Sequence, residues 1–256
     1  VLQLRKQQID DLLLESEIDK NRLLGVGIGV PGVIDYKNNY SVFFERINGW
    51  ENVLIGDIIQ EYIGKSVYIC NDVNLISWAE RKVAHLEDIK NMLYIIIRSG
   101  IGMAIWNDGS LMQGEMGNSG RIGHMTVDKN GLQCKCGNRG CLGLYTSEKS
   151  MIRMYGELTG KELKWAGELF PLAEAGDAAA LQVFETCGRY LGTGIVNVAN
   201  LFDISEVVLS TSFDSSYILK SAQYALDARK MNTIRREVKV RKGLLQESSF
   251  GLGGCL

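Results

Sequence analysis

The chain has 256 residues, of which 46% are hydrophobic and 23% charged, and its formal net charge at pH 7 is −2. This composition suits a globular protein with one large core or two medium ones, and it excludes disordered and collagen-like classes. Its charges form no basic stripe, so we do not expect this stretch to bind DNA by itself.

The longest apolar run, Met92–Ile97, is far shorter than the roughly 20 residues that a membrane-spanning helix needs. No basic segment followed by an apolar stretch and a cleavage site opens the sequence, so we find no secretion signal. Cys70, Cys187 and Cys255 lie scattered in apolar surroundings, which suits buried free thiols in a reducing compartment. These features lead us to expect a cytoplasmic protein.

Helical and extended patterns alternate along the first half of the chain. Helical spacing begins at once, without an initiating Met, so we expect further sequence upstream. Gly64 follows a stripe of isoleucines that is typical of an amphipathic helix, and it should end this helix. The predicted elements are a helix over 4–18, a strand over 24–30, a helix over 53–63, a strand over 67–70, a helix over 73–85 and paired strands over 93–97 and 101–106, with turn residues at 107–109.

The second half continues the alternation. Thr146 or Ser147 is placed to cap a helix, and Gly176-Asp177 is placed to stop one element and cap a long helix. The predicted elements are a helix over 151–158, the long helix with apolar positions from 181 to 202, a strand over 207–209, a helix over 217–228 and an edge strand over 238–241. This pattern predicts an α/β architecture with mixed sheets.

Between the two halves lies a cluster of metal-binding residue types. His124, Cys134, Cys136 and Cys141 fall within eighteen positions, among the glycines Gly123, Gly131, Gly137 and Gly140 that can form tight turns. Zn²⁺ prefers four tetrahedral sulfur or nitrogen ligands, and this set would leave no open position for a reacting water. A structural zinc site is therefore predicted. A disulfide with a spare thiol, or a chance cluster of buried cysteines, remains the alternative.

The segment around these residues resembles a known signature. Gly114–Cys141, GEMGNSGRIGHMTVDKNGLQCKCGNRGC, is similar to the zinc-binding signature of the ROK family, which unites bacterial sugar kinases and sugar-responsive transcriptional repressors. GVGIGVPGVID at Gly25–Asp35, Asn71-Asp72 and SGIG at Ser99–Gly102 also resemble ROK segments, in the right order. The resemblance covers nearly the whole chain.

The resemblance implies an actin-like, two-domain fold of the sugar kinase and Hsp70 type, with ligand between the domains. The first domain would contain residues 1–92 and about 245–256, without its front strands, and the second would contain residues 93–244, with the zinc site and the dimerisation helices. Family members usually form dimers or tetramers, so a homo-oligomer is expected.

Asn71 and Asp72 follow a predicted strand, at the end where open α/β sheets place ligand contacts. In ROK kinases the residue matching Asp72 is the general base that activates the sugar hydroxyl for attack on Mg-ATP. The resemblance makes Asn71 a sugar-hydroxyl contact. The alternative for Asp72 is that it only caps the following helix.

The resemblance also gives His124 two roles, as a zinc ligand and as a neighbour of a sugar hydroxyl. The alternative is a hydrogen-bonded core histidine. His85, near the end of a predicted helix, is expected at the surface.

Two departures from the family pattern affect the sugar site. Arg121 and Gly143 stand where the family has glutamates that hold sugar hydroxyls. Each lost charge-assisted hydrogen bond is worth roughly 1.5–3 kcal/mol, so a neutral hexose should bind poorly. Arg121 would instead favour an anionic sugar if it faces the ligand, since guanidinium pairs bidentately with such groups. Otherwise it points to solvent or pairs with a carboxylate such as Glu115.

Two further departures affect the nucleotide site. The family's N-terminal phosphate loop would lie before Val1, and Arg98, Ser210 and Thr211 occupy positions of glycines in ATP-binding members. Residues with a Cβ restrict the close approach that glycine allows.

We therefore predict the sugar-sensing, oligomerising domain of a ROK transcriptional regulator, whose DNA-binding part would precede residue 1. The alternative is an ATP- and Mg²⁺-dependent ROK sugar kinase without its front. A third possibility is a scaffold that binds no ligand.

Overall fold

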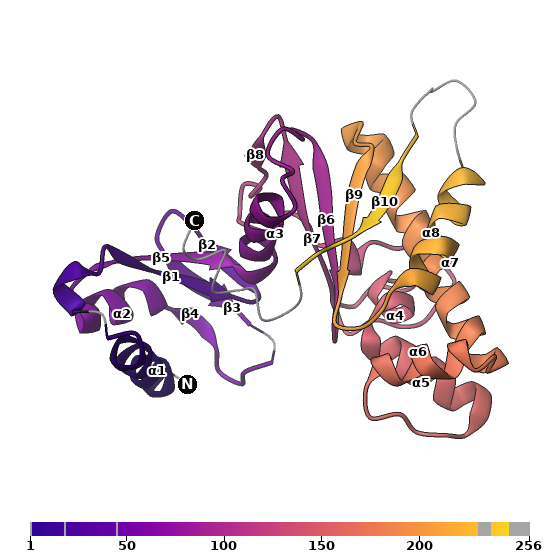
Figure 1. The fold of residues 1–256 in the computed structure, drawn as a ribbon, viewed down its shortest axis with the longest axis horizontal. Helices are drawn as coiled ribbons and strands as arrows, with labels where there is room; N and C mark the ends of the chain where they lie inside the picture. The colour runs from indigo at the N-terminus through magenta and orange to yellow at the C-terminus, as the bar shows by residue number, and fades with distance from the viewer. Residues whose placement is uncertain (1, 18, 45, 230–236, 246–256) are drawn as a thin grey trace. The chain divides into compact units, whose positions relative to one another are not determined.

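The computed structural model describes residues 2–17, 19–44, 46–229 and 237–245, and the chain forms two compact units (Figure 1). The first unit contains the described residues up to Ala79 together with Gln113–Ser119. The second contains Glu80–Met112 and the described residues from Gly120 onward. The predicted domain division at residues 92 and 93 stays a prediction, and most of the C-terminal end on which it draws lies outside the described residues.

Two small sheets and two α-helices make up most of the first unit. Strands β1 and β5 pair in parallel, and β2, β3 and β4 form an antiparallel sheet. The elements are α1 (Leu2–Glu15), η1 (Lys20–Arg22), β1 (Gly25–Val30), β2 (Val33–Asp35), β3 (Tyr40–Phe43), β4 (Glu51–Val53), α2 (Ile55–Ile63), β5 (Ser66–Asn71) and the start of α3 (Asp72–Val83). The chain passes into the second unit within α3.

Helix α2 follows directly from its isoleucine stripe. Ile55, Ile59 and Ile63 recur every four residues and are all buried, as one face of a helix requires. Gly64 ends the helix in the left-handed conformation, and its N–H donates to the Gln60 carbonyl. The helix begins later than predicted because the residues just before it pair with β3 as strand β4.

The outer edge of β5 is held by a side chain. Asn39 donates through Nδ2 to the Val67 carbonyl at 2.7 Å and accepts the Ile69 N–H at 2.9 Å. The amide thus takes the hydrogen-bonding place of a neighbouring strand. This contact holds the strand that leads directly into Asn71 and Asp72.

A five-stranded mixed sheet, in the order β10-β9-β6-β7-β8, organises the second unit. Every residue of its central strand β6 is buried, as expected for a strand covered on both faces. The elements are β6 (Met92–Ile97), β7 (Ile101–Asn107), β8 (Ser110–Leu111), η2 (Ile122–His124), α4 (Gly143–Thr146), α5 (Glu148–Thr159), η3 (Ala166–Glu168), α6 (Leu169–Glu174), α7 (Ala178–Phe202), β9 (Glu206–Thr211), α8 (Ser216–Asp227) and β10 (Lys239–Lys242). The paired strands, the edge strand and the mixed sheet are confirmed.

The long helix α7 begins where the sequence predicts. Asp177 is its N-cap and accepts the Ala180 N–H at 2.9 Å. Figure 1 shows α7 and α8 side by side. A Cβ at Gly188 would lie 2.4 Å from the Ser221 Cβ, so this glycine allows the close approach of the two helices. Leu181, expected on the apolar stripe, is instead 36% exposed, because it lies at the edge of the helix face that buries Ala180, Val183 and Phe184.

Within the part of the chain that the structure describes, we find no helix with both the length and the apolar character needed to cross a bilayer.

A buried carboxylate fastens the segment after β10. Glu80 of α3 is 1% exposed, and its two oxygens accept the N–H groups of Leu244 at 2.7 Å and Leu245 at 2.9 Å. The Leu245 carbonyl in turn accepts the hydroxyl of Ser210 at 2.8 Å. Hydrogen bonds to a charged acceptor are among the stronger ones, so this contact should stabilise the second unit.

We predict that Glu80→Gln destabilises the second unit. The substitution replaces one acceptor oxygen by an NH₂ group that faces a backbone donor, which should lower the free energy of unfolding by about 2 kcal/mol. Urea denaturation followed by tryptophan fluorescence measures the change. Glu157→Gln is the matched control, since its exposed ion pair with Arg153 should contribute about 0.5 kcal/mol or less. Equal effects of the two substitutions would contradict the prediction.

Candidate metal centre

Two short stretches of antiparallel pairing bring the predicted metal ligands together in the second unit. Thr126 pairs with Cys141, and Gln133 pairs with Arg139. The Leu142 N–H also donates to the Met125 carbonyl at 2.9 Å. His124 lies two residues before Thr126, which pairs with Cys141. His124 and Cys141, seventeen residues apart in sequence, therefore become neighbours.

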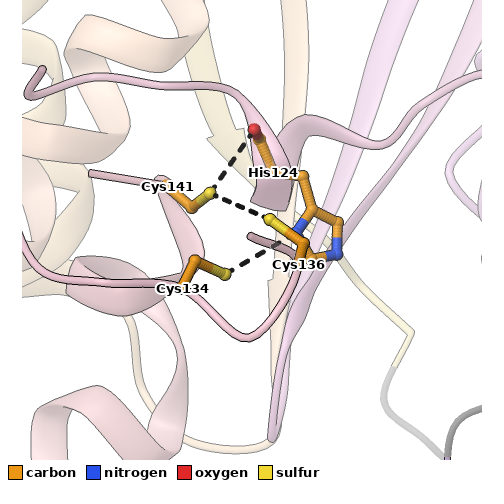
Figure 2. A group of neighbouring side chains, drawn as sticks. All are labelled: His124, Cys134, Cys136 and Cys141. Carbon is orange, nitrogen blue, oxygen red and sulfur yellow. Dashed lines mark hydrogen bonds between the residues drawn. The ribbon is translucent and has the colours of Figure 1, made fainter. Parts of the chain in front are cut away.

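The four side chains converge on one point (Figure 2). Their ligand atoms all lie within 4.8 Å of one another. The Cys136 and Cys141 sulfurs are 3.6 Å apart, and the Cys134 sulfur is 3.9 Å from His124 Nδ1. Ligands of a tetrahedral Zn²⁺ lie about 3.3–3.8 Å from one another, so the two sulfur contacts are close to this spacing, while the widest separation in the cluster is larger.

The turn that carries Cys134 and Cys136 is held by its own backbone. The Cys134 N–H donates to the Asn138 carbonyl at 2.8 Å, and the Gly137 N–H donates to the Cys134 carbonyl at 3.1 Å. The Gln133 amide also donates to the Gly137 carbonyl at 3.1 Å. The two thiols are therefore presented by a short, closed turn.

Gly140 is required by both conformation and space. Its φ is +63°, and a Cβ there would lie 1.6 Å from the Asp128 carbonyl oxygen. A residue with a side chain would push the backbone at Asp128 away from the segment that carries Cys141. The predicted turn glycines Gly137 and Gly140 have positive φ, and Gly131 closes a turn through its N–H to the Asp128 carbonyl, whereas Gly123 has an ordinary φ and allows close packing against Ile101.

The thiols differ in acidity because their surroundings differ. A hydrogen bond from the Asn138 backbone, with help from the neighbouring thiols, lowers the pKa of Cys136 to about 7. Burial, together with the neighbouring thiols, raises the pKa of Cys141 to about 12. A bound cation would favour the thiolate form of all of them. The donor set thus fits a closed, four-ligand Zn²⁺ site, in which the metal would stabilise the loop and supply no reactive water.

The other predicted site residues fall in different parts of the chain. Asn71 and Asp72 belong to the first unit, and Arg121 and His124 belong to the second. Asn71 Oδ1 accepts the Val73 N–H at 3.0 Å and its Nδ2 donates to the Gly32 carbonyl at 3.3 Å. Asn71 therefore makes a capping contact at α3, and Asp72 is the first residue of that helix.

Arg121 and Gly143 flank the metal loop. Arg121 is exposed and directly precedes η2, which carries His124. Gly143 opens α4, and a Cβ there would lie 3.2 Å from the Gly123 carbonyl oxygen. His85 is exposed just after α3, as predicted.

Two supporting residues escaped the sequence analysis. Gln133 ties the cysteine turn together, and Tyr145 accepts the Leu132 N–H at 3.1 Å. The position of Gln133 next to Cys134 was the available signal for the first. Tyr145 lies thirteen residues from its partner, and its sequence context carries no sign of the contact.

A model of the ROK family matches residues 4–246 of this chain. The chain belongs to the ROK family. The ROK resemblance of the metal-loop signature is thereby confirmed.

Its relatives include both regulators and kinases of the ROK family. The xylose repressor of Bacillus spizizenii is 34% identical over 220 residues, which cover 86% of this chain and 53% of the repressor. The glucokinase of Halalkalibacterium halodurans is 28% identical over 96% of this chain and 79% of the kinase. The chain therefore spans about half the length of the repressor that it matches.

A solved ROK structure has the same fold. A ROK family transcriptional regulator, a homologue of E. coli Mlc, superposes with a TM-score of 0.87 at 25% identity, over 99% of this chain and 66% of the regulator. ROK kinases of known structure share the fold as well. The predicted actin-like α/β fold is confirmed, and the His and Cys cluster is compatible with its predicted zinc site.

We predict that Cys141→Ser removes bound zinc. The substitution takes away one of four ligands, so zinc content should fall from about one ion per chain to a small fraction after dialysis against a chelator. Elemental analysis measures the content. Cys187→Ser is the control, because Cys187 is a fully buried free thiol outside the cluster and should leave the zinc content unchanged. Loss of zinc in both variants, or in neither, would refute the assignment.

Zinc affinity should rise with pH, and more steeply below neutrality than above it. Cys141 is protonated in the metal-free protein over this whole range and must always release a proton on binding. Cys136, whose pKa is lowered to about 7, releases a proton only where it is still a thiol. Competition titrations with a chelator at about pH 6 and about pH 8 measure the slope. An affinity independent of pH would contradict thiolate ligation.

Proposed function

We propose that this chain is the sugar-sensing, oligomerising part of a ROK transcriptional regulator. The observation that carries the proposal lies at the end of β9. Ser210 and Thr211, where ATP-binding members have paired glycines, are nearly buried, and the Ser210 hydroxyl donates to the Leu245 carbonyl. Side chains and their own hydrogen bonds occupy positions where a nucleotide would need to approach the backbone.

The neighbouring contacts support the same conclusion. Ser212 donates its hydroxyl to Glu148 at 2.5 Å, and Lys242 forms an ion pair with Asp214 at 2.7 Å. These polar groups are satisfied within the protein, so a nucleotide would have to break bonds in order to make its own. These contacts argue against ATP binding, so under this proposal Asp72 carries out no phosphoryl-transfer step.

The similarity to xylose repressors also supports a regulator. Under this proposal Asn71, Asp72 and His124 contact a carbohydrate effector, and a DNA-binding module precedes Val1. Effector binding shifts an equilibrium between two arrangements of the domains or subunits of a cytoplasmic homo-oligomer. Zn²⁺, held by His124 and the three cysteines, keeps the loop that presents His124 in place.

Arg121 favours an effector with a negative charge, such as a sugar acid or sugar phosphate. The guanidinium pairs bidentately with such a group, whereas a neutral hexose offers it only hydroxyls. Gly143 adds no acceptor of its own. Both residues flank the loop of His124.

A sugar kinase is the second candidate, because a glucokinase aligns with 96% of this chain. In that case Asp72 is the catalytic base, and Mg-ATP is the second substrate. The loss of glycines at Arg98, Ser210 and Thr211 argues against it.

Thermal shift with a panel of ligands tests the proposal. We expect Mg-ATP to leave Tm unchanged and one sugar class to raise it, with sugar acids or phosphates more effective than xylose or glucose. At about 100 Kd the stabilisation is about 2.7 kcal/mol, or roughly 5–10 °C in Tm for a chain of this size. Arg121→Ala should weaken binding of the anionic sugar at least about tenfold while sparing neutral sugars.

Asp72→Asn provides the site control, because it keeps the shape of the side chain and should abolish the sugar-induced shift. A clear upward shift with Mg-ATP would favour the kinase instead. Equal indifference to neutral and anionic sugars would end the effector proposal and leave a scaffold.

A further inference from the structure

Tyr145 of α4 lies directly under the metal loop. Its side chain is 7% exposed, and its hydroxyl accepts the Leu132 N–H at 3.1 Å. Leu132 is two residues before the ligand Cys134. The hydroxyl therefore anchors the backbone that leads into the metal ligands.

The loop is shaped to lie close to this hydroxyl. A Cβ at Gly131 would lie 2.0 Å from the Tyr145 oxygen and 3.0 Å from Asp128 Oδ2. The Gly131 N–H donates to the Asp128 carbonyl at 3.0 Å, and its carbonyl accepts a hydrogen bond from Arg139 at 3.2 Å. Gly131 thus permits a contact that any other residue would block.

The Tyr145 ring also contacts the long helix α7. Its ring stacks on Tyr190 of α7, with centroids 4.0 Å apart and ring planes at 14°. Tyr190 lies between Gly188 and Gly192, two residues at which α7 approaches α8 closely. A Cβ at Gly192 would lie 2.6 Å from the Ala222 carbonyl oxygen of α8, so small displacements of α7 here are felt by α8.

We infer that Tyr145 is a positioning residue that couples the metal loop to helix α7. Its hydroxyl holds the loop in the geometry in which the thiols converge. Its ring, stacked on Tyr190, restricts the motion of Tyr190 when the loop is held in place. Metal occupancy then stiffens the segment of α7 around Tyr190. The inference goes beyond the proposed function, because it concerns the loop and the helix whether or not a sugar binds.

The first experiment measures the hold on the metal in the full chain. Tyr145→Phe keeps the ring on Tyr190 and removes only the hydroxyl, so zinc transfer to a chromogenic chelator should be about tenfold faster than in the wild type. Cobalt-substituted protein gives a second readout, since the ligand-field absorption of bound Co²⁺ reports the ligand geometry and should change in the variant.

Tyr155→Phe is the matched control. Tyr155 is likewise buried in the second unit, at 1% exposed, and donates its hydroxyl to Asp177 at 3.2 Å, away from the metal loop. The Tyr155→Phe variant should lose stability without a change in zinc transfer or in the cobalt spectrum. Zinc transfer in Tyr145→Phe within about twofold of the control would overturn the role of the hydroxyl.

The second experiment measures the coupling to α7. In the wild type, removal of zinc should speed amide hydrogen exchange at residues 188–192. Tyr190→Phe keeps the stacked ring and should preserve this response, whereas Tyr190→Leu removes the ring and should abolish it while zinc transfer stays slow. A response that persists in Tyr190→Leu, or that is absent in the wild type, would refute the coupling.

Discussion

The convergence of three cysteine sulfurs and one histidine nitrogen within 4.8 Å is the constraint on which the rest of the site depends. Such a group is unfavourable when its thiols are charged and unpaired, and it becomes favourable when one cation is shared among them. Most residues of the loop are exposed, so its shape depends on its own hydrogen bonds and on this cluster rather than on burial. Contacts with the core hold the loop in place, and a bound metal would hold its four ligands together.

Those contacts join the loop to the buried hydrophobic core of the second unit. Cys141 and Leu142 are fully buried, and Leu142 belongs to the same hydrophobic core as β6 and α7. Tyr145 adds a polar contact on the loop side and a stacked ring on the helix side. A site that lies on the surface is thus attached to a rigid sheet and helix, as the precise orientation of His124 requires.

The same scaffold serves kinases and regulators in this family, so function has to be argued from particular side chains. Under the proposed function, the replacement of glycine by Ser210 and Thr211 matters because their side chains and the Ser210 hydrogen bond would fill space that a nucleotide needs. Arg121 and Gly143, which stand where the family pattern has glutamates, are a second and independent difference near His124. Together these residues support the proposal of a chain that keeps the family fold and its His and Cys cluster while its ligand chemistry differs.

The sequence by itself determined the longer helices, the central strands and the four residues that form the His and Cys cluster. Caps such as Asp177, stops such as Gly64 and the spacing of the cysteines act over a few residues, so their effect is local and legible. The sequence analysis did not predict the short strands β2 to β4 or the short helices α4 and α6. Elements of so few residues show no clear hydrophobic periodicity. Only the tertiary structure decided that Glu80 binds a segment 164 residues away and that Tyr145 lies between the loop and Tyr190. Such contacts depend on which surfaces the folded chain brings together, and no local pattern encodes that.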